Sequence, residues 1–427
     1  MSSVWFMVGV VWGVRILLNL FSYIHLWYVK EYRLDRMSIH LRTPQGKKLL
    51  FIPWRRPPVT PKTIVIAIGG AIGLYILYAA IPGSMFIKLL GTDIATFSVV
   101  SLLVILTKIP TLVYHQILIR RAVFKLRGHK PMTVIGITGS YGKTSTKEIL
   151  ATLLSQKYKI LATQASKNSP IAIAELVLSE LTAEHEVFIV EMGAYKKGEI
   201  AQMSQMVQPE IGVVTAINAQ HQDLFGSIQN TVEAKYELIK GLTGRRIAIV
   251  NHDNLYVEKM GKRAAFDGCK VIEYSTRGIT ITQDSKGIRF SGLSVNLFGA
   301  HQVSNILAAM EAARAVGMTK QEIIRAAQSV RPLPHTMNPR RGINGSLFID
   351  DTFNNNPEAA IAALDYLAMQ SGKKVLVFQP MIELGEFAKD SHETVAKRAG
   401  EVASEIILTN ESFADTFLKF KNNAQVS

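Results

Sequence analysis

The sequence predicts an α/β protein with transmembrane helices at its N-terminus, and three observations lead to this fold class. Three long apolar runs lie within the first 130 residues. The residues that follow alternate short β-rich runs with amphipathic stretches, which is typical of a parallel sheet covered by helices on both faces. Charge divides the chain at the same point, because residues 1–130 hold 17 of the 48 Lys and Arg but only 3 of the 33 Asp and Glu.

The apolar runs extend from Val4 to Tyr28, from Thr63 to Ile81 and from about Ile94 to Leu118. Each is long enough to cross a hydrocarbon core of about 30 Å as a helix. Arg15 interrupts the first run, and a charge there costs about 3 kcal/mol at the bilayer centre unless it pairs or reaches the interface. We expect three spans, with an interfacial first helix as the alternative.

The distribution of Lys and Arg predicts the orientation of these helices. Nine Lys and Arg lie in the segment 29–62 and five more follow the third run, whereas the connection 82–93 has only Lys88 against Asp93. Positive residues favour the cytoplasmic side. We therefore expect an external N-terminus, a multi-pass protein of the inner (cytoplasmic) membrane in contact with the lipid bilayer, and cytoplasmic C-terminal domains.

Composition excludes several classes of site. The single cysteine, Cys269, rules out a disulfide framework and a zinc site built on several cysteines. Residues 131–427 hold 31 Lys and Arg against 30 Asp and Glu, so the predicted α/β part is almost neutral. That balance argues against a basic cleft for nucleic acid, and we expect no nucleic-acid partner.

The α/β part is expected to form two domains, 131–334 and 335–427, after a membrane module at 1–130. Three prolines, Pro332, Pro334 and Pro339, indicate a linker between the two. The expected elements of the first are strands at 133–138, 187–191, 211–217 and 246–250, helices near 143–156, 171–182, 229–241, 302–316 and 319–329, and a β-rich part at 270–298. The second begins with 346–351 and includes strands at 374–378 and 405–408, with little chain left after the last strand.

A glycine-rich loop is the strongest local signal. It joins the strand at 133–138 to the next helix and contains, in order, Gly139, Ser140, Tyr141, Gly142, Lys143, Thr144 and Ser145. Backbone N–H groups of such a loop face a phosphate, with the Lys143 ammonium on the β- and γ-phosphates and the Thr144 hydroxyl on Mg²⁺. The usual P-loop motif has its first glycine at the position that Ile137 occupies here. The sequence therefore predicts a P-loop ATPase-type sheet domain with a variant loop that binds ATP and Mg²⁺.

Three further residues are candidates for a metal site. Glu191 ends the apolar strand at 187–190, at the edge of the sheet where α/β proteins bind ligands, and a carboxylate suits Mg²⁺. His221 also follows a predicted strand, although a lone histidine is more often structural. Lys235 lies on a predicted helix, where a solvated surface lysine is the usual interpretation.

The loop Thr-Gly-Ser-x-Gly-Lys-Thr-Ser-Thr resembles that of the Mur ligases, ATP-dependent amide ligases of cell-wall synthesis. The resemblance runs from about 133 to 410 and is closest to the branch that adds D-alanyl-D-alanine. Further blocks of that branch recur in order at 191–194 with 198–200, 209–212, 218–227, 234–237, 299–305, 350–357 and 381–385 with His392. Gln302 replaces an asparagine of the 299–305 block.

The resemblance implies roles for individual residues. It implies that Glu191, His221, Thr144 and a carbamylated Lys235 hold magnesium. The implied catalytic residues are Lys143, Glu191, His221 and Lys235. The resemblance also implies that His301 and Asn305 contact the base and ribose of ATP. The alternative is that these residues cap a helix. A role in binding substrate or nucleotide is implied for Asp350, Asp351, Asn354 and Asn356. The alternative is that these residues form a polar turn. The implied C-terminal domain is Rossmann-like.

The implied activity is an ATP-dependent ligase of peptidoglycan precursor synthesis. A carboxylate like that of UDP-N-acetylmuramoyl-tripeptide takes the γ-phosphoryl group of ATP, and the amine of D-alanyl-D-alanine displaces phosphate from the acyl phosphate. The expected partners are therefore D-alanyl-D-alanine and a nucleotide-sugar peptide or a lipid-linked acceptor.

Three departures from the family keep alternatives open. Membrane helices occupy the place of the domain that holds the UDP-sugar. The usual Pro-Gly-Arg-Met of the linker reads Pro-His-Thr-Met at 334–337, with Arg340 or Arg341 as possible substitutes, and Phe353 replaces a tyrosine. The C-terminal domain is expected to be short. The alternatives are a membrane amide ligase that makes a poly-amino-acid such as poly-γ-glutamate, and a catalytically inactive nucleotide-binding membrane scaffold.

Overall fold

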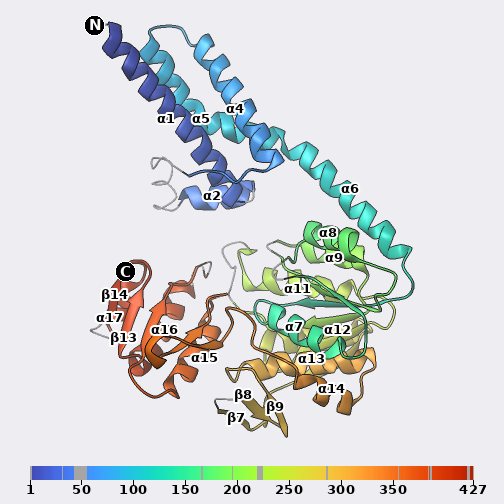
Figure 1. Ribbon diagram of the computed structural model, residues 1–427. Helices are drawn as coiled ribbons and strands as arrows, with labels where there is room; N and C mark the ends of the chain where they lie inside the picture. The colour runs from blue at the N-terminus through green and yellow to red at the C-terminus, as the bar shows by residue number, and fades with distance from the viewer. Residues whose placement is uncertain are drawn as a thin grey trace. The chain divides into compact units, whose positions relative to one another are not determined.

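The structure is a computed structural model that describes residues 2–30, 32–42, 55–164, 167–194, 196–218, 225–284, 287–353, 355–382, 384, 387–420 and 424–426. The chain divides into two compact units, Met1–Ile117 and Leu118–Ser427, and each is described by itself (Figure 1). The sequence-based fold class, an α/β protein with apolar N-terminal helices, is confirmed.

The first unit is built of helices. They are α1 (Ser2–Val29), α2 (Leu34–Arg42), α4 (Pro61–Ala80), α5 (Met85–Leu106) and the start of α6 (Lys108–Arg127). Helices α1, α4 and α5 pack around a shared apolar core that includes Leu20, Ile66 and Val100. Three helical stretches, Trp5–Val29, Pro61–Ala80 and Met85–Arg127, are long and apolar enough to cross a membrane.

The third apolar helical stretch begins earlier than the sequence predicts. Because α5 starts at Met85, Lys88 and Asp93 lie inside a helix rather than in the connection 82–93. The hydroxyl of Thr92 donates to the carbonyl of Lys88, so this polar side chain forms its hydrogen bond within the helix. The connection between α4 and α5 is therefore only a short turn.

Arg15 is paired across the helices, which removes the main objection to a spanning first helix. Its Nε lies 3.1 Å from Asp93 Oδ2, and Trp12 and Asn19 also donate to that carboxylate. The Asp93 side chain is only 10% exposed. A charge within an apolar helix is tolerated when it pairs with a partner in the bundle.

This ion pair predicts a stability effect. Asp93→Asn leaves the Arg15 charge unpaired among apolar helices, so we expect the free energy of unfolding to fall by about 2–3 kcal/mol. The change is measured as a lower melting temperature of the detergent-solubilised protein. The double variant Arg15→Leu, Asp93→Leu recovers most of the loss, because neither charge remains. An unchanged melting temperature of Asp93→Asn contradicts a stabilising pair.

A parallel sheet of six strands forms the centre of the second unit. Its strands are β1 (Thr133–Thr138), β2 (Ile160–Ala162), β3 (Val187–Glu191), β4 (Ile211–Val214), β5 (Ile247–Asn251) and β6 (Lys270–Tyr274). They lie in the order β2-β3-β1-β4-β5-β6, and every neighbouring pair is parallel. Residues of each strand alternate between the faces, so Ile135 and Ile137 join one apolar core and Val134 joins another.

Helices cover both faces of this sheet (Figure 1). One layer contains α7 (Lys143–Leu154), α13 (Gln302–Val316) and α14 (Lys320–Ala327). The other contains α8 (Pro170–Glu180), α9 (Glu199–Val207), α11 (Ile228–Lys240) and α12 (Leu255–Phe266). The expected β-rich part continues after β6 as a small antiparallel sheet of β7 (Ile281–Asp284), β8 (Gly287–Phe290) and β9 (Leu293–Val295).

The last part of the chain is a smaller α/β assembly. It starts with an antiparallel hairpin of β10 (Asn338–Arg341) and β11 (Leu347–Asp350), which enclose a helical turn at Ile343–Gly345. A parallel sheet follows, formed by β12 (Val375–Phe378), β13 (Glu405–Leu408) and β14 (Ala424–Val426), with helices α15 (Pro357–Ala368), α16 (Ala388–Val402) and α17 (Ala414–Leu418). One helix and one strand therefore follow β13.

Candidate functional site

The glycine-rich loop lies where three neighbouring strands end. It follows β1, which lies between β3 and β4 in the sheet. Backbone bonds hold the loop in place, because the Ser140 N–H donates to the carbonyl of Ala216 over 2.7 Å. Ala216 lies beyond Val214, where β4 ends, so the strand is shorter than the expected 211–217. The loop therefore opens at the carboxyl edge of the sheet, where α/β proteins bind ligands.

Two glycines are required by the conformation of this loop. Gly142 has φ +79° and Gly139 has φ +151°, both in the region that disfavours side chains. A Cβ atom at Gly142 would lie 2.5 Å from Asn305 Oδ1, and one at Gly139 would collide with Thr215 Oγ1. The loop can pack closely against Thr215 and Asn305 only because these two positions carry no side chain.

The Lys143 ammonium lies over the loop. Its Nζ donates to the carbonyls of Gly139 and Ser140, at 2.8 and 3.0 Å. Removal from water lowers the pKa of this lysine, and the charge of Glu191 opposes that shift. Thr144 and Ser145 line the same cleft as Lys143. The loop thus presents a cation and hydroxyl groups to one volume.

Glu191 is a buried carboxylate with one oxygen available. Oε1 accepts from Asn168 Nδ2 at 3.0 Å, whereas Oε2 accepts no hydrogen bond from the described residues. The fully buried Lys147 Nζ lies 3.7 Å from Oε2 and donates to the carbonyl of Thr163 at 2.6 Å. Neither Asn168 nor Lys147 was a sequence-based candidate, although Lys147 lies one helical turn after Lys143. These two residues fix the position of the carboxylate.

Lys235 is buried on α11, contrary to the usual expectation of a solvated lysine. Burial and, to a smaller extent, the charge of Lys143 lower the pKa of Lys235 to about 7. Its Nζ lies 5.9 Å from the centre of the Phe225 ring. A large fraction of this side chain is therefore an uncharged amine at neutral pH.

Two predicted site residues, His221 and Asn354, lie outside the described residues, as do Glu383 and Gly385 of the 381–385 block. Within the described part of the chain, no three His, Cys, Asp or Glu side chains lie close enough together to hold a metal ion. The predicted metal set includes only one described residue of these types, Glu191.

The loop opens into a cavity of about 430 Å³, within the size range of nucleotide and small-molecule sites. Its walls come from the loop, from the segments after β4, β5 and β6, from the start of α13 and from the start of α15. Polar lining residues include Asn251, Asp253, Thr276, His301, Asn305, Asp351, Asn356 and Glu358.

His301 and Asn305 both face this cavity from the start of α13. His301 makes no side-chain capping bond, so the capping alternative is not supported, and its buried Nδ1 has no hydrogen-bond partner in the described chain. Removal from water lowers the pKa of His301 to about 4, which keeps the ring neutral. Asn305 accepts from Thr146 at 3.4 Å and donates to Gln302 at 2.8 Å. The substituted Gln302 thus orients the asparagine.

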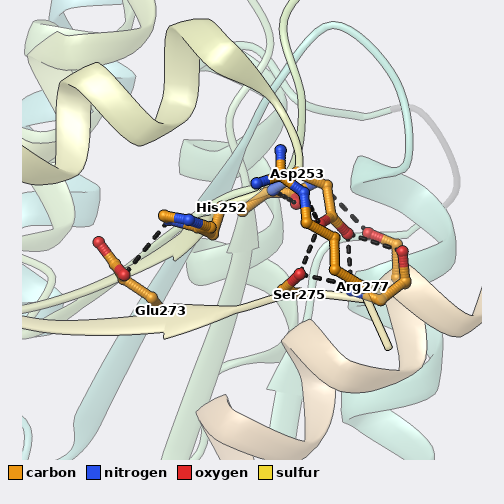
Figure 2. A network of polar contacts seen from close by, with 8 residues as sticks. His252, Asp253, Glu273, Ser275 and Arg277 are labelled. Atoms are coloured by element: carbon orange, nitrogen blue, oxygen red, sulfur yellow. Dashed lines mark hydrogen bonds and ion pairs between the residues drawn. The ribbon is translucent and has the colours of Figure 1, made fainter. Parts of the chain in front are cut away.

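The cavity wall formed by β5 and β6 was not anticipated from the sequence. Figure 2 shows Asp253, which follows β5, among residues that follow β6. The carboxylate accepts from Ser275 Oγ at 2.5 Å and from the Thr276 N–H at 2.6 Å, with Arg277 at 3.4 Å. Burial raises the pKa of Asp253, but these bonds and the Arg277 charge outweigh it and hold the pKa below its usual value. The polar run directly after an apolar strand was the available signal.

The predicted residues of the 350–357 block point to different places. Asp351 and Asn356 line the cavity, and burial raises the pKa of Asp351 to about 6. Asn356 also caps α15 by accepting from the Ala359 N–H at 2.9 Å. Asp350 instead accepts from His335 at 2.9 Å, with Arg340 Nη2 3.6 Å away. Arg340 therefore reaches this block from β10.

The loop geometry predicts the effect of one substitution. Gly142→Ala places a methyl group against Asn305 and strains a left-handed backbone, so we expect nucleotide affinity to fall about tenfold or more. Equilibrium dialysis with labelled ATP measures this. Gly372→Ala is the matched control, because Gly372 has φ +86° but open space around its Cβ position. Equal affinity of both variants contradicts the tight approach of the loop to Asn305.

Comparison with known families confirms the resemblance. Residues 137–313 match the Mur ligase middle domain, and residues 337–423 match the Mur ligase, glutamate ligase domain. The chain belongs to the Mur ligase family. The part of this Mur ligase that precedes the matches contains the apolar helices and so differs from the UDP-binding domain usual in the family.

Individual relatives indicate which branch of the Mur ligase family this chain is similar to. UDP-N-acetylmuramoyl-tripeptide–D-alanyl-D-alanine ligase of Synechocystis sp. is 31% identical over 68% of this chain and 65% of its own length. The crystal structure of MurF from Acinetobacter baumannii is 26% identical with a TM-score of 0.65, covering 73% of this chain and 71% of that one. MurF ligase of Thermotoga maritima in complex with ADP is 25% identical with a TM-score of 0.64, covering 73% and 74%. This Mur ligase thus spans less than two thirds of the Synechocystis enzyme.

Proposed function

We propose that this Mur ligase joins D-alanyl-D-alanine to a carboxylate like that of UDP-N-acetylmuramoyl-tripeptide, at the expense of ATP, in peptidoglycan precursor synthesis. One observation carries the proposal. The glycine-rich loop follows β1 and Glu191 ends β3, both at the carboxyl edge of one parallel sheet, and the loop opens into a cavity that the 350–357 block also lines. The buried Lys235 lies close enough to Lys143 and Glu191 for their charges to act on it. The names of the relatives specify the substrates, and ADP in the Thermotoga structure supports ATP as the phosphoryl donor.

The proposed roles follow the positions of the side chains. Residues 139–145 hold the phosphates of ATP, and His301 and Asn305 hold the nucleoside. Asp351 and Asn356, together with Asp350 and Asn354, bind substrate or nucleotide. The proposed domains are 1–130, 131–334 and 335–427.

Magnesium fits the oxygen donors at this edge of the sheet. Glu191 has a buried oxygen that forms no hydrogen bond with the described residues, and Thr144 adds a hydroxyl, both of which suit a hard cation. The uncharged amine of Lys235 can add CO₂ to form a carbamate, which would supply a further oxygen ligand, with His221 as the remaining proposed ligand. A bound magnesium ion supplies neutralisation of the phosphate charge.

The proposed reaction has two steps. An oxygen of the acceptor carboxylate attacks the γ-phosphorus of ATP, which breaks the bond to ADP and forms an acyl phosphate. The amine of D-alanyl-D-alanine then attacks the acyl carbon, loses a proton, and phosphate leaves with the carboxylate oxygen. Lys143 stabilises the charge on the phosphoryl oxygens, which is the main contribution a protein makes to this chemistry.

We also propose that the protein is a multi-pass protein of the cytoplasmic membrane with its ligase domains on the cytoplasmic side. Three helices are long and apolar enough to span, and the Arg15–Asp93 pair satisfies the charge within the first of them. The excess of Lys and Arg in the segment 29–62 supports the orientation.

Phosphate release from ATP tests the proposed function. The full-length protein in detergent receives UDP-N-acetylmuramoyl-tripeptide and D-alanyl-D-alanine, together and singly. We expect release only with both, and mass spectrometry should detect the pentapeptide product. Phosphate release that needs neither substrate would contradict this assignment. The absence of phosphate release from protein that has bound ATP would contradict it as well. Release that depends on glutamate alone would favour a poly-amino-acid ligase instead.

A further inference from the structure

The first unit contains a cavity that the ligase reaction does not use. Its volume is about 540 Å³, and it lies between α1, α4 and the chain segment that precedes α4. The lining consists of apolar side chains and two arginines, namely Leu18, Phe21, Arg55, Arg56, Pro57, Pro58, Val59, Thr63, Ile64 and Ala67. All of these residues lie within the first unit.

The two arginines form the polar end of the cavity. Hydrogen bonds to α1 fix their backbone, because the Arg55 N–H donates to Ser22 Oγ at 3.2 Å and His25 Nδ1 lies 3.0 Å from the Arg56 carbonyl oxygen. The Thr63 hydroxyl donates to the carbonyl of Pro58 at 2.7 Å, which fixes the same segment to the start of α4. The backbone that carries the two guanidinium groups is thus held beside the cavity.

These guanidinium groups have no acidic partner in the part of the chain that the structure describes. Both residues are exposed, and neither forms an ion pair with a described residue. Asp93, the acidic residue described in α5, is already occupied by Arg15, Trp12 and Asn19. Two adjacent cations at one end of a cavity attract a doubly coordinated anion such as phosphate.

The walls of the cavity are apolar and belong to helices that are long enough to span a membrane. Phe21 is 42% exposed on α1 and Ile64 is 46% exposed on α4, so a part of each side chain is not covered by protein. Arg55 and Arg56 lie in the positively charged segment 29–62, which the distribution of charge places at the cytoplasmic headgroup level. A soluble phosphate compound would leave the apolar walls exposed.

We propose that this cavity binds one membrane lipid with a phosphate headgroup. The phosphate accepts hydrogen bonds from Arg55 and Arg56, and the upper parts of the lipid chains lie against Leu18, Phe21 and Ile64. The site is separate from the nucleotide cleft and does not rest on the proposed ligase activity. Its consequence is that one anionic lipid of the cytoplasmic leaflet stays bound to the first unit.

Native mass spectrometry of the full-length protein in detergent tests this site, with dioleoylphosphatidylglycerol as the probe. We expect one lipid to be retained per protein molecule, and Arg55→Ala, Arg56→Ala to weaken its retention about tenfold or more. Arg120→Ala, Arg121→Ala is the matched control, because it removes another exposed adjacent pair from the same charged side of the membrane part. It should retain the lipid within about twofold of the original chain.

A second variant tests the apolar part independently of charge. Ala67→Phe occupies part of the cavity beside α4 and should also lower retention, with an unchanged melting temperature as the check on folding. Dioleoylglycerol, which lacks the phosphate, should not be retained, and glycerol 1-phosphate should not displace the lipid. Equal losses for both arginine pairs, retention of dioleoylglycerol, displacement by glycerol 1-phosphate, or full retention by Ala67→Phe would each overturn the proposal.

Discussion

Lys143→Met is expected to abolish ligase turnover, with kcat reduced about a thousandfold or more. The Lys143 ammonium is the cation positioned over the glycine-rich loop, where its two bonds are to backbone carbonyls rather than to a carboxylate. It is therefore available to move onto phosphoryl oxygens when ATP binds. Methionine keeps the length of the side chain and removes the charge, so the fold should be preserved.

Two measurements decide this prediction. Phosphate release gives kcat, and circular dichroism verifies that the variant is folded. Lys320→Met serves as the control, because Lys320 is an exposed lysine at the start of α14 and lies away from the cavity. Turnover of Lys143→Met within about tenfold of the original chain would show that the loop does not act on the transferred phosphoryl group.

Lys235→Ala should reduce turnover about a hundredfold or more, because it removes the side chain that we propose is carbamylated. Carbamylation requires the uncharged amine, and the pKa of Lys235 is lowered to about 7. The reactive form therefore predominates above pH 7 and is lost as the pH falls below it. Turnover should fall on the acidic side of pH 7 and rise with added bicarbonate at a given pH.

The carbamate can be detected without an activity measurement. Protein incubated with ¹³C-bicarbonate should show one slow-exchanging carbonyl signal that Lys235→Ala lacks. Acetate should restore part of the turnover of Lys235→Ala by supplying the missing carboxylate. Lys240→Ala is the control, because Lys240 is exposed on the same helix. A scaffold without catalysis would be indifferent to both substitutions.

Local patterns in the sequence were sufficient for the elements that carry the reaction. The strands β1 and β3 and the helix α13 have the predicted bounds or nearly so, because each is a continuous apolar run or an amphipathic run with a clear start. The loop and Glu191 were predicted for the same reason, since both follow directly from such strands. Strand β2 was missed because three residues, Ile160–Ala162, give too short a pattern.

Contacts between distant residues could not be predicted in this way. Asn168 and Lys147 position Glu191 from other elements, and nothing local distinguishes them from surface residues. Arg15 appeared to be an isolated charge because its partner, Asp93, lies 78 residues later, in a segment that seemed to be a loop. Asp350 faces His335 and Arg340 rather than the cavity because β10 and β11 pair as a hairpin, which the proline-rich linker concealed.

Transfer of oxygen from the acceptor to phosphate tests the central claim most directly. UDP-N-acetylmuramoyl-tripeptide labelled with ¹⁸O in its terminal carboxylate is supplied with ATP and D-alanyl-D-alanine, and the released phosphate is analysed by mass spectrometry. An amide ligase that forms an acyl phosphate transfers one ¹⁸O atom to each phosphate and keeps the other in the new amide. Unlabelled phosphate would mean that water attacks ATP, and would contradict the proposed ligase.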